Sequence, residues 1–153
     1  MCKAIVTMDW QGISLAQHLW QIFEVHRDRI ALGHYGSVDQ SGATFGDLQE
    51  KAMRLAGALA VHEPKIQRVL LCVGPGQSFI VGLLACLFAG KLVAPCFAPQ
   101  GRRNKQRFHV IQSSFQADLV LCDEENKRQF PSHLNVRDIA GLISDGCMRN
   151  AVD

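Results

Sequence analysis

The sequence feature best placed to do chemistry is the turn Gly74-Pro75-Gly76, which separates a continuous apolar run from a helical one. A glycine-rich turn between a strand and a helix is where dinucleotide-binding proteins cradle phosphate. The fingerprint requires a third glycine three residues after the second, and Phe79 stands there instead. Pro75 also lacks a backbone N–H that would hold a phosphate oxygen. We therefore predict a structural turn, with a phosphate cradle as the disfavoured alternative.

A second candidate is a cluster of basic residues that follows the last apolar loop: Arg102, Arg103, Lys105 and Arg107. A functional interpretation makes them contacts to the phosphates of a nucleotide, coenzyme A or nucleic acid. The structural interpretation makes them a solvated loop and helix face. We favour the structural one, because the acidic residues 123–125 offset the charge and no aromatic residues interleave as in base-stacking platforms.

Other catalytic patterns fail. There is no G-x-S-x-G elbow, no H-E-x-x-H helix and no complete P-loop, since Leu92 follows Gly90-Lys91 where Ser or Thr is required. His18 and His26 are eight residues apart, too distant to share a metal, so we expect helix-surface or half-buried structural roles for them. We assign no catalytic residue and no metal ligand, and the cofactor-binding residues remain unknown at this point.

The six cysteines show neither C-x-x-C pairs nor zinc-finger spacing. Cys72, Cys86 and Cys122 lie inside apolar runs, where a free thiol packs as a small hydrophobic group. Because the chain is long and its first residues have too short an apolar stretch for a signal peptide, we predict reduced cysteines rather than disulfides. A reducing compartment in turn predicts a cytoplasmic protein.

The elements that would position these residues follow from periodicity. Two amphipathic helices come first, at Ser14–Arg27 and from Thr44 to about His62, with Ser14 and Thr44 as N-caps. We place Leu15, Leu19, Ile22, Phe23 and His26 on the inward face of the first helix. Between the helices we expect a short strand at 30–35 and a polar turn at 37–42.

Strands and helices then alternate. We predict strands at 68–73, 92–97 and 118–122, separated by a buried helix at 77–89 that Gly90 terminates and by an amphipathic helix at 104–115. A short helix at 123–130 and a strand at 134–136 are weaker predictions. This order implies an α/β fold with three layers, in which helices cover both faces of a mainly parallel sheet.

Composition agrees with a folded domain. Of 153 residues, 48% are apolar and 20% charged, and the net charge of +2 gives no global case for nucleic acid or an anionic membrane. The uncharged run from Val69 to Gly90 resembles a membrane span, but the Gly-Pro-Gly turn interrupts it. We predict three parts: an N-terminal extension at 1–13, a partial domain at 14–137, and a tail at 138–153 that is truncated or disordered.

Several segments resemble the start of AMP-forming acyl-adenylating enzymes, the AMP-dependent synthetase/ligase superfamily. Thr44-Phe-Gly-Asp-Leu48, followed by Ala-Gly-Ala-Leu59, is similar to a helix near their N-terminus. The stretches Arg68–Ile80 and Leu84–Pro95 resemble their next strands and turns. The loop Cys96–Pro99, with Arg103 and Arg107 after it, is similar to the fatty acyl-AMP ligase branch. The resemblance covers about Leu15 to Asp123.

The resemblance implies a role in lipid metabolism, namely formation of a fatty acyl-adenylate from a fatty acid and ATP with Mg²⁺. Members of the family hold the ATP phosphates with a Ser/Thr/Gly-rich loop ending in lysine, and they use a lysine of a mobile C-terminal domain. Neither occurs in these 153 residues. We therefore expect a fragment of the N-terminal domain, not catalytically competent alone, whose partners are the remainder of the enzyme or an acyl carrier protein.

Two hypotheses remain open. A fragment of an adenylating enzyme predicts exposed apolar surface where the remainder packs, and no exchange of pyrophosphate into ATP. A free-standing, non-catalytic binding or partner-docking module predicts a monodisperse monomer that melts cooperatively. A third and weaker one, an unrelated nucleotide-binding domain, is disfavoured by the missing third glycine.

Overall fold

The computed structural model describes residues 14–33, 42–62 and 64–149. The predicted extension at 1–13, the polar turn at 37–42 except Gly42, and Cys2 lie outside the described residues. Every element follows the order predicted from the sequence, except one additional helix at the end and one short strand. The helices and strands are α1 Leu15–Val25, β1 Ile30–Leu32, β2 Ala43–Thr44, α2 Phe45–His62, β3 Arg68–Cys72, α3 Gln77–Phe88, β4 Leu92–Pro95, α4 Gly101–Phe115, β5 Leu119–Cys122, the 3-10 helix η1 Glu124–Gln129, β6 Val136–Asp138 and α5 Ile139–Arg149.

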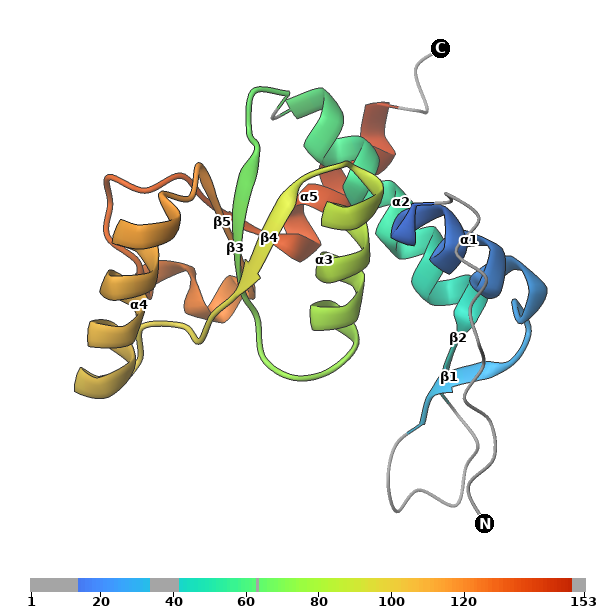
Figure 1. Ribbon diagram of the computed structural model, residues 1–153, viewed down its shortest axis with the longest axis horizontal. Coiled ribbons are helices and arrows are strands. Elements are labelled where there is room, and N and C mark those ends of the chain that lie inside the picture. The colour runs from blue at the N-terminus through green and yellow to red at the C-terminus, as the bar shows by residue number, and fades with distance from the viewer. Residues whose placement is uncertain (1–13, 34–41, 63, 150–153) are drawn as a thin grey trace.

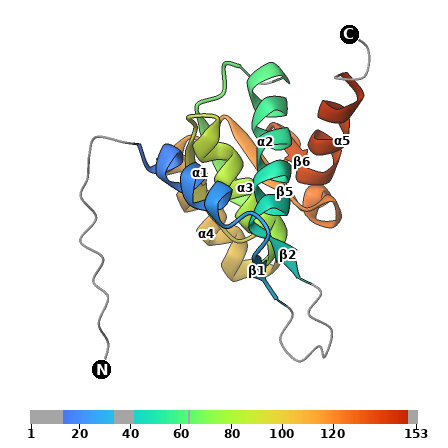
Figure 2. The ribbon, with the colours of Figure 1, turned by 90° about the vertical axis from the view of Figure 1, so that its right-hand side faces the viewer.

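A parallel sheet of four strands, in the order β4-β3-β5-β6, forms the middle layer. Helices α2, α3 and α5 cover one face of this sheet, and α4 covers the other (Figure 1). The predicted α/β fold with three layers is therefore confirmed. A separate antiparallel pair, β1 and β2, stands beside the start of α2. Helix α1 lies on the outer side of α2 and α3, away from the sheet (Figure 2).

The predicted helix ends are confirmed by hydrogen bonds. Ser14 Oγ accepts from Gln17 N at 3.2 Å while Ser14 N donates to the Gln17 side chain at 2.9 Å, which forms a capping box. Thr44 and Asp47 cap α2 in the same reciprocal way. Gly90, at φ +65°, ends α3 as the left-handed residue of a Schellman motif, with its N–H on Leu87 O and Lys91 N on Cys86 O.

The run Val69–Gly90 forms strand β3, the turn and helix α3, as predicted. Val69, Leu70, Leu71 and Ala85 are wholly inaccessible to solvent. In the part of the chain that the structure describes, no helix combines the length and apolarity needed to cross a bilayer.

Two predictions need correction. The inward face of α1 is rotated: Phe23 is buried, whereas Leu15 is 50% and Ile22 36% exposed. The reason is that α1 rests on α2 and α3 through Phe23 and Trp20, whose ring meets Phe88 edge-on at 5.8 Å. The segment 138–153, expected as a truncated or disordered tail, contains α5, because Ile139 and Leu142 pack into the core beside α2.

Candidate functional site

The carboxyl ends of the four strands meet at one edge of the sheet, and this edge is the candidate site. Its last register pairs are Leu71 with Pro95, Cys72 with Cys122, and Cys122 with Asp138. The chain passes from β3 outward to β4 on one side and from β5 to β6 on the other. In open α/β sheets, ligands bind outside the carboxyl ends of the strands where the direction of winding reverses. That point lies between β3 and β5.

A carboxylate occupies the place where a phosphate cradle would have to form. Gly74 N donates to Asp123 Oδ2 at 3.0 Å, which ties the turn after β3 to the end of β5. Gly76 has φ +141°, a conformation that favours glycine, and begins α3 without a side-chain cap. Because the Gly74 N–H is already used and its partner is negatively charged, the turn is structural, as we favoured from the sequence.

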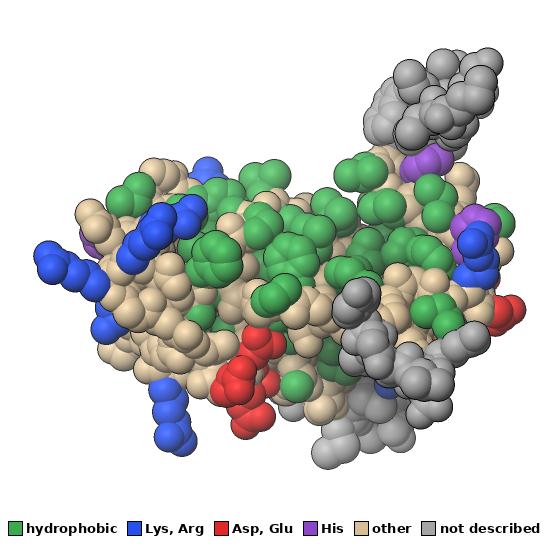
Figure 3. Space-filling model, turned by 90° about the horizontal axis from the view of Figure 1, so that it is seen from below, with side chains coloured by type: hydrophobic (Ala, Val, Ile, Leu, Met, Phe, Trp, Pro, Cys, Tyr) green, Lys and Arg blue, Asp and Glu red, His purple; other side chains and the backbone are tan. Residues whose placement is uncertain are grey.

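An apolar hollow of about 510 Å³ opens beside this turn, between the ends of β3 and β4 and the helix α4. It is lined by Val73, Pro75, Phe79, Pro95, Cys96, Phe97, Arg107 and Ile111. Phe97 is 64% exposed, and the Arg107 guanidinium lies 5.9 Å from the centre of its ring. Figure 3 views this side of the molecule and shows hydrophobic side chains gathered across its middle, with basic residues at the α4 end.

Three thiols lie in a row beside the hollow, at the ends of β4, β3 and β5. Cys72 and Cys122 are register partners, and Cys96 N donates to Leu71 O in the neighbouring strand. Burial raises the pKa of Cys72 far above its ordinary value, raises that of Cys122 to about 11 and raises that of Cys96. The thiols therefore stay protonated at neutral pH, and Cys72, Cys86 and Cys122 are reduced core cysteines as predicted.

These properties define what the hollow can do. Of its lining side chains only Arg107 and Cys96 are ionisable. A guanidinium is always charged, and the pKa of the Cys96 thiol is raised, so neither group serves as a general base near pH 7. The hollow therefore suits binding of an apolar group beside one positive charge, and it does not suit acid–base chemistry.

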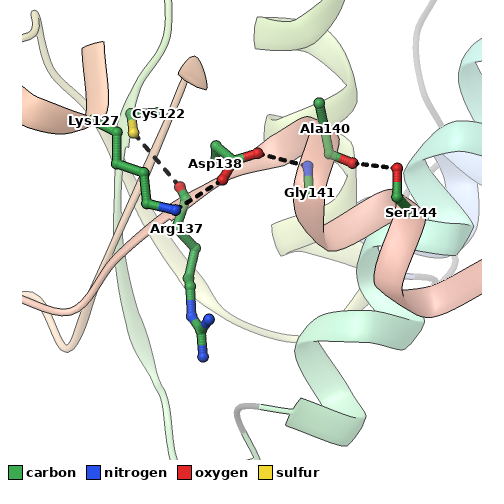
Figure 4. Close-up of polar contacts among 7 residues, drawn as sticks. All are labelled: Cys122, Lys127, Arg137, Asp138, Ala140, Gly141 and Ser144. Carbon is green, nitrogen blue, oxygen red and sulfur yellow. Dashed lines mark hydrogen bonds and ion pairs between the residues drawn. The ribbon is translucent and has the colours of Figure 1, made fainter. Parts of the chain in front are cut away.

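A polar cluster at the ends of β5 and β6 is structural (Figure 4). Asp138 accepts from Gly141 N at 2.6 Å and from Lys127 Nζ at 3.0 Å, so it caps α5 and ties η1 to it. Burial opposes the charge of Asp138, but these two donors outweigh it and lower the pKa of the carboxyl. A Cβ at Gly141 would stand only 2.7 Å from Asp138 Oδ1, so this cap requires glycine.

A buried amide that the sequence did not reveal links α4 to η1. Asn126 Oδ1 accepts from the side chains of Gln100 at 2.7 Å and Gln129 at 3.0 Å. Gln100 is the residue that precedes α4, and its side chain is therefore not free to cap that helix. No sequence signal pointed to Asn126, because its partners are a loop residue of an earlier segment and a neighbour on a short helix.

The basic residues singled out from the sequence all lie on α4 and are exposed: Arg102, Arg103, Lys105 and Arg107. Arg107 alone lines the apolar hollow. His18 and His26 are half-buried on or beside α1, and His26 Nδ1 lies 3.4 Å from an Arg29 nitrogen. Among the described residues, no three His, Cys, Asp or Glu side chains are grouped as metal ligands would be.

Comparison with known sequences identifies relatives that match more than half of the chain. No protein-family profile matches the chain. The medium-chain fatty acid–[acyl-carrier-protein] ligase JamA of Moorena producens is 31% identical over 91 residues, which are 58% of this chain and 15% of the ligase. A second such ligase, from Teredinibacter turnerae, is 29% identical over 90 residues. The chain thus spans about a seventh of the length of these relatives.

Solved structures with the same fold come from adenylating enzymes. The fatty acid AMP ligase from Legionella pneumophila superimposes with a TM-score of 0.75 at 18% identity, over 88% of this chain and 25% of that one. The N-terminal subdomain of Klebsiella oxytoca NpsA superimposes with a TM-score of 0.70 at 19% identity, over 86% of this chain and 32% of that subdomain chain. By sequence and by fold, the chain is similar to the N-terminal part of the AMP-forming acyl-adenylating enzymes, with fatty acid ligases among its relatives.

Proposed function

We propose that this chain forms the N-terminal part of an enzyme that activates a fatty acid as its acyl-adenylate, and that by itself it supplies scaffold and substrate surface rather than catalysis. The observation that carries the proposal is the agreement of two comparisons. The sequence is 31% identical to a medium-chain fatty acid ligase over 91 residues, and the fold superimposes on a fatty acid AMP ligase over 88% of the chain.

The site supports the same conclusion. The hollow between β3, β4 and α4 is apolar, about 510 Å³ in volume, and lacks a group suited to proton transfer. An aliphatic chain is the kind of ligand that such walls bind, because burying each methylene group contributes about 0.8 kcal/mol. Arg107 at the margin adds a fixed positive charge that suits the carboxylate or phosphate end of a substrate.

In the proposed reaction the carboxylate attacks the α-phosphorus of ATP, and pyrophosphate leaves. Such chemistry depends on positioning and on charge stabilisation, which Mg²⁺ and a lysine normally provide. The 153 residues contain no Ser/Thr/Gly-rich loop ending in lysine. Arg107 is the one cation at the hollow, and it has no second positive group beside it among the lining residues. The groups that grip triphosphate are therefore proposed to come from other parts of the enzyme.

A segment exchange tests the proposal directly. The matched 91 residues of the Moorena producens ligase are replaced by the corresponding residues of this chain. We expect a folded chimera that retains exchange of pyrophosphate into ATP when a medium-chain fatty acid is present. The control chimera additionally carries Leu71→Ala in the core and should lose folding and exchange together. A chimera that folds but exchanges no pyrophosphate contradicts the proposal.

The isolated chain tests the non-catalytic part. With ATP, Mg²⁺ and a medium-chain fatty acid, we expect no exchange above background, because the 153 residues contain no Ser/Thr/Gly-rich loop ending in lysine to hold the triphosphate. The same preparation should bind the fatty acid alone, seen as nuclear magnetic resonance shifts at Phe97 and Ile111, which line the hollow. Exchange that depends on the fatty acid would show that the chain is an enzyme by itself.

A further inference from the structure

Helix α4 carries an unusual concentration of positive charge. Its residues, Gly101–Phe115, include Arg102, Arg103, Lys105 and Arg107 and contain no Asp or Glu. All four cations are exposed, and none of them forms an ion pair with another residue that the structure describes. The basic side chains elsewhere include Arg54 and Lys127, which each lie against a carboxylate. The charge on α4 is thus left without an ionic partner in the described parts of the molecule.

The position of these cations within the helix makes this costly. Arg102 and Arg103 lie in the first turn of α4, where the helix dipole is positive and a basic side chain is unfavourable by about 0.3–1 kcal/mol. Lys105 and Arg107 follow in the second turn, where the dipole has little effect. No side chain caps the first turn, and the side chain of Gln100 is committed to Asn126. A helix start that combines free N–H groups with unpaired cations is stabilised by an anionic partner.

Exposed apolar side chains lie next to the cations of α4. Phe97 is 64% and Val110 58% exposed, and Arg107 lies beside both. A shallow hollow of about 400 Å³ runs along α4 between Arg103 and Ile111. Arginines with a neighbouring aromatic ring and an apolar hollow are typical of protein–protein interfaces. A nucleic-acid surface instead needs a longer basic track and several stacking rings, whereas the hollows here offer two rings, Phe79 and Phe97, beside a short basic stretch.

The two flanks of α4 differ in their charged neighbours. The hydrogen bond between Gln100 and Asn126 places η1, with its exposed Glu124 and Glu125, next to the start of α4. Lys105 lies on that flank, because it lines a hollow together with Gln129 of η1. Arg103 and Arg107 lie on the other flank with Phe97 and Val110. We call these four residues the arginine surface.

We propose that the arginine surface docks an acidic amphipathic helix of a partner protein, with carboxylates on Arg103 and Arg107 and an apolar side chain in the hollow beside Val110. The inference rests on the proposed function for the identity of the partner, which is then the carrier protein that accepts the acyl group. The Moorena producens relative is named as a ligase for an acyl carrier protein. Docking on α4 places that partner next to the apolar hollow at the end of β4.

Binding to the isotope-labelled chain tests this proposal. Two probes are used: the acyl carrier protein loaded by the Moorena producens ligase, and a short helical peptide with glutamates along one face. We expect both to shift the resonances of Arg103, Arg107, Val110 and Phe97. A matched peptide with glutamine in place of glutamate should leave them unmoved. Raising the salt concentration from about 0.05 M to about 0.5 M should weaken both complexes, because exposed charges are screened.

Substitution gives the second measurement. The double variant Arg103→Gln with Arg107→Gln should bind each probe about tenfold more weakly, the effect expected when two charges at an interface lose their partners. Lys51→Gln with Lys65→Gln removes the same net charge from exposed positions away from α4 and should change affinity less than about twofold. The amide spectrum of each variant shows whether it folds.

The possible results separate the two proposals. If only the carrier protein fails to bind, docking of an acidic helix stands and the carrier-protein assignment fails. If the carrier protein shifts residues elsewhere, the proposed function stands and the arginine surface is wrong. If neither probe moves the arginine surface, or if a short DNA duplex or phosphatidylserine vesicles bind it more tightly than the acidic peptide, the docking proposal is overturned.

Discussion

The two faces of the sheet are covered unequally. Three helices, α2, α3 and α5, seal one face over a large apolar core, whereas α4 alone covers the other, over a small cluster with Leu70, Phe108 and Phe130. On the three-helix face Leu55, Leu59 and Ala85 are wholly buried. The one-helix face leaves hollows along both flanks of α4, and the charges of that helix have no ionic partner among the described residues. The first face therefore holds the fold together, and the second presents the surfaces proposed to bind.

Two adjacent leucines of β3 measure this difference most directly. Leu71 points to the three-helix face and Leu70 to the one-helix face, and both are completely buried. We expect Leu71→Ala to lower the free energy of unfolding by about 4–5 kcal/mol and Leu70→Ala by about 2–3 kcal/mol. The reason is that a single helix can settle into a cavity, whereas packed helices cannot. Urea denaturation of both variants checks the ranking, and equal losses would contradict it.

A close approach between helix α3 and the sheet gives the next prediction. A Cβ added at Gly82 of α3 would stand 2.7 Å from Leu71 Cδ1 and 3.1 Å from Ile139 Cδ1. Because both neighbours are buried, Gly82→Ala should destabilise the chain by about 1–3 kcal/mol, as urea denaturation would measure.

Gly57 provides the matched control for this substitution. It lies in α2 and is exposed, and a methyl group added there would meet no atom of a neighbouring element within 4 Å. Gly57→Ala should therefore raise the free energy of unfolding by about 0.5–1 kcal/mol, as expected for alanine in a helix interior, and raise the melting temperature with it. A tolerated Gly82→Ala would mean that the three-helix face is looser than its packing indicates.

Local sequence signals predicted elements on both faces of the sheet. Continuous apolar stretches predicted β3 and α3, and Gly90 was correctly placed at the end of α3 because its motif is local. Ser14 and Thr44 were found as caps for the same reason. The inward face of α1 was missed because α1 packs on other helices and not on the sheet. Apolar residues occur on more than one side of α1, and the sequence alone does not show which side is buried. Helix α5 was missed because its cap, Asp138, is a strand residue.

The candidate site was only partly predictable. The Gly74-Pro75-Gly76 turn was correctly assigned to structure, but its partner Asp123 is 49 residues away and no sequence pattern connects them. Arg107 was noted as one of four cations, and nothing in its spacing indicated that it alone borders the apolar hollow. The pairing of strand ends across the sheet brings Asp123 to Gly74 and places Arg107 at the hollow. That register is a property of the whole fold and not of a local sequence pattern.

A polar side chain inside the three-helix face provides a smaller test. Gln49 of α2 is 2% exposed, and both polar atoms of its amide lack a hydrogen-bond partner among the described residues. Since an unsatisfied buried amide costs about 1–3 kcal/mol, Gln49→Met should stabilise the chain by about 1 kcal/mol. Gln106→Met on the exposed side of α4 serves as control and should change the melting temperature little. A lower melting temperature for Gln49→Met would show that the amide of Gln49 has a hydrogen-bond partner, and would contradict the prediction.

The smallest effect concerns the carboxylate that anchors α5 to the three-helix face. The pKa of Asp138 is lowered on folding, because the donors Gly141 N and Lys127 outweigh its burial. Its contribution to stability is therefore present above the unfolded value of about 3.9 and is lost as pH falls through the lower, folded value. Asp138→Asn should be less stable than the native chain at pH 6, and the difference should shrink as the pH falls from about 5 to about 2.

Urea denaturation across that pH range, with hydrogen exchange of the α5 amides, measures this effect. Exchange in α5 should quicken in Asp138→Asn at pH 6, while the amides of α4 should be unchanged, since α4 covers the opposite face. Glu125→Gln on η1 is the control, because this exposed carboxylate has no ion pair among the described residues. If Asp138→Asn loosened α4 as much as α5, the two faces would unfold as one unit and the distinction between them would apply to packing but not to stability.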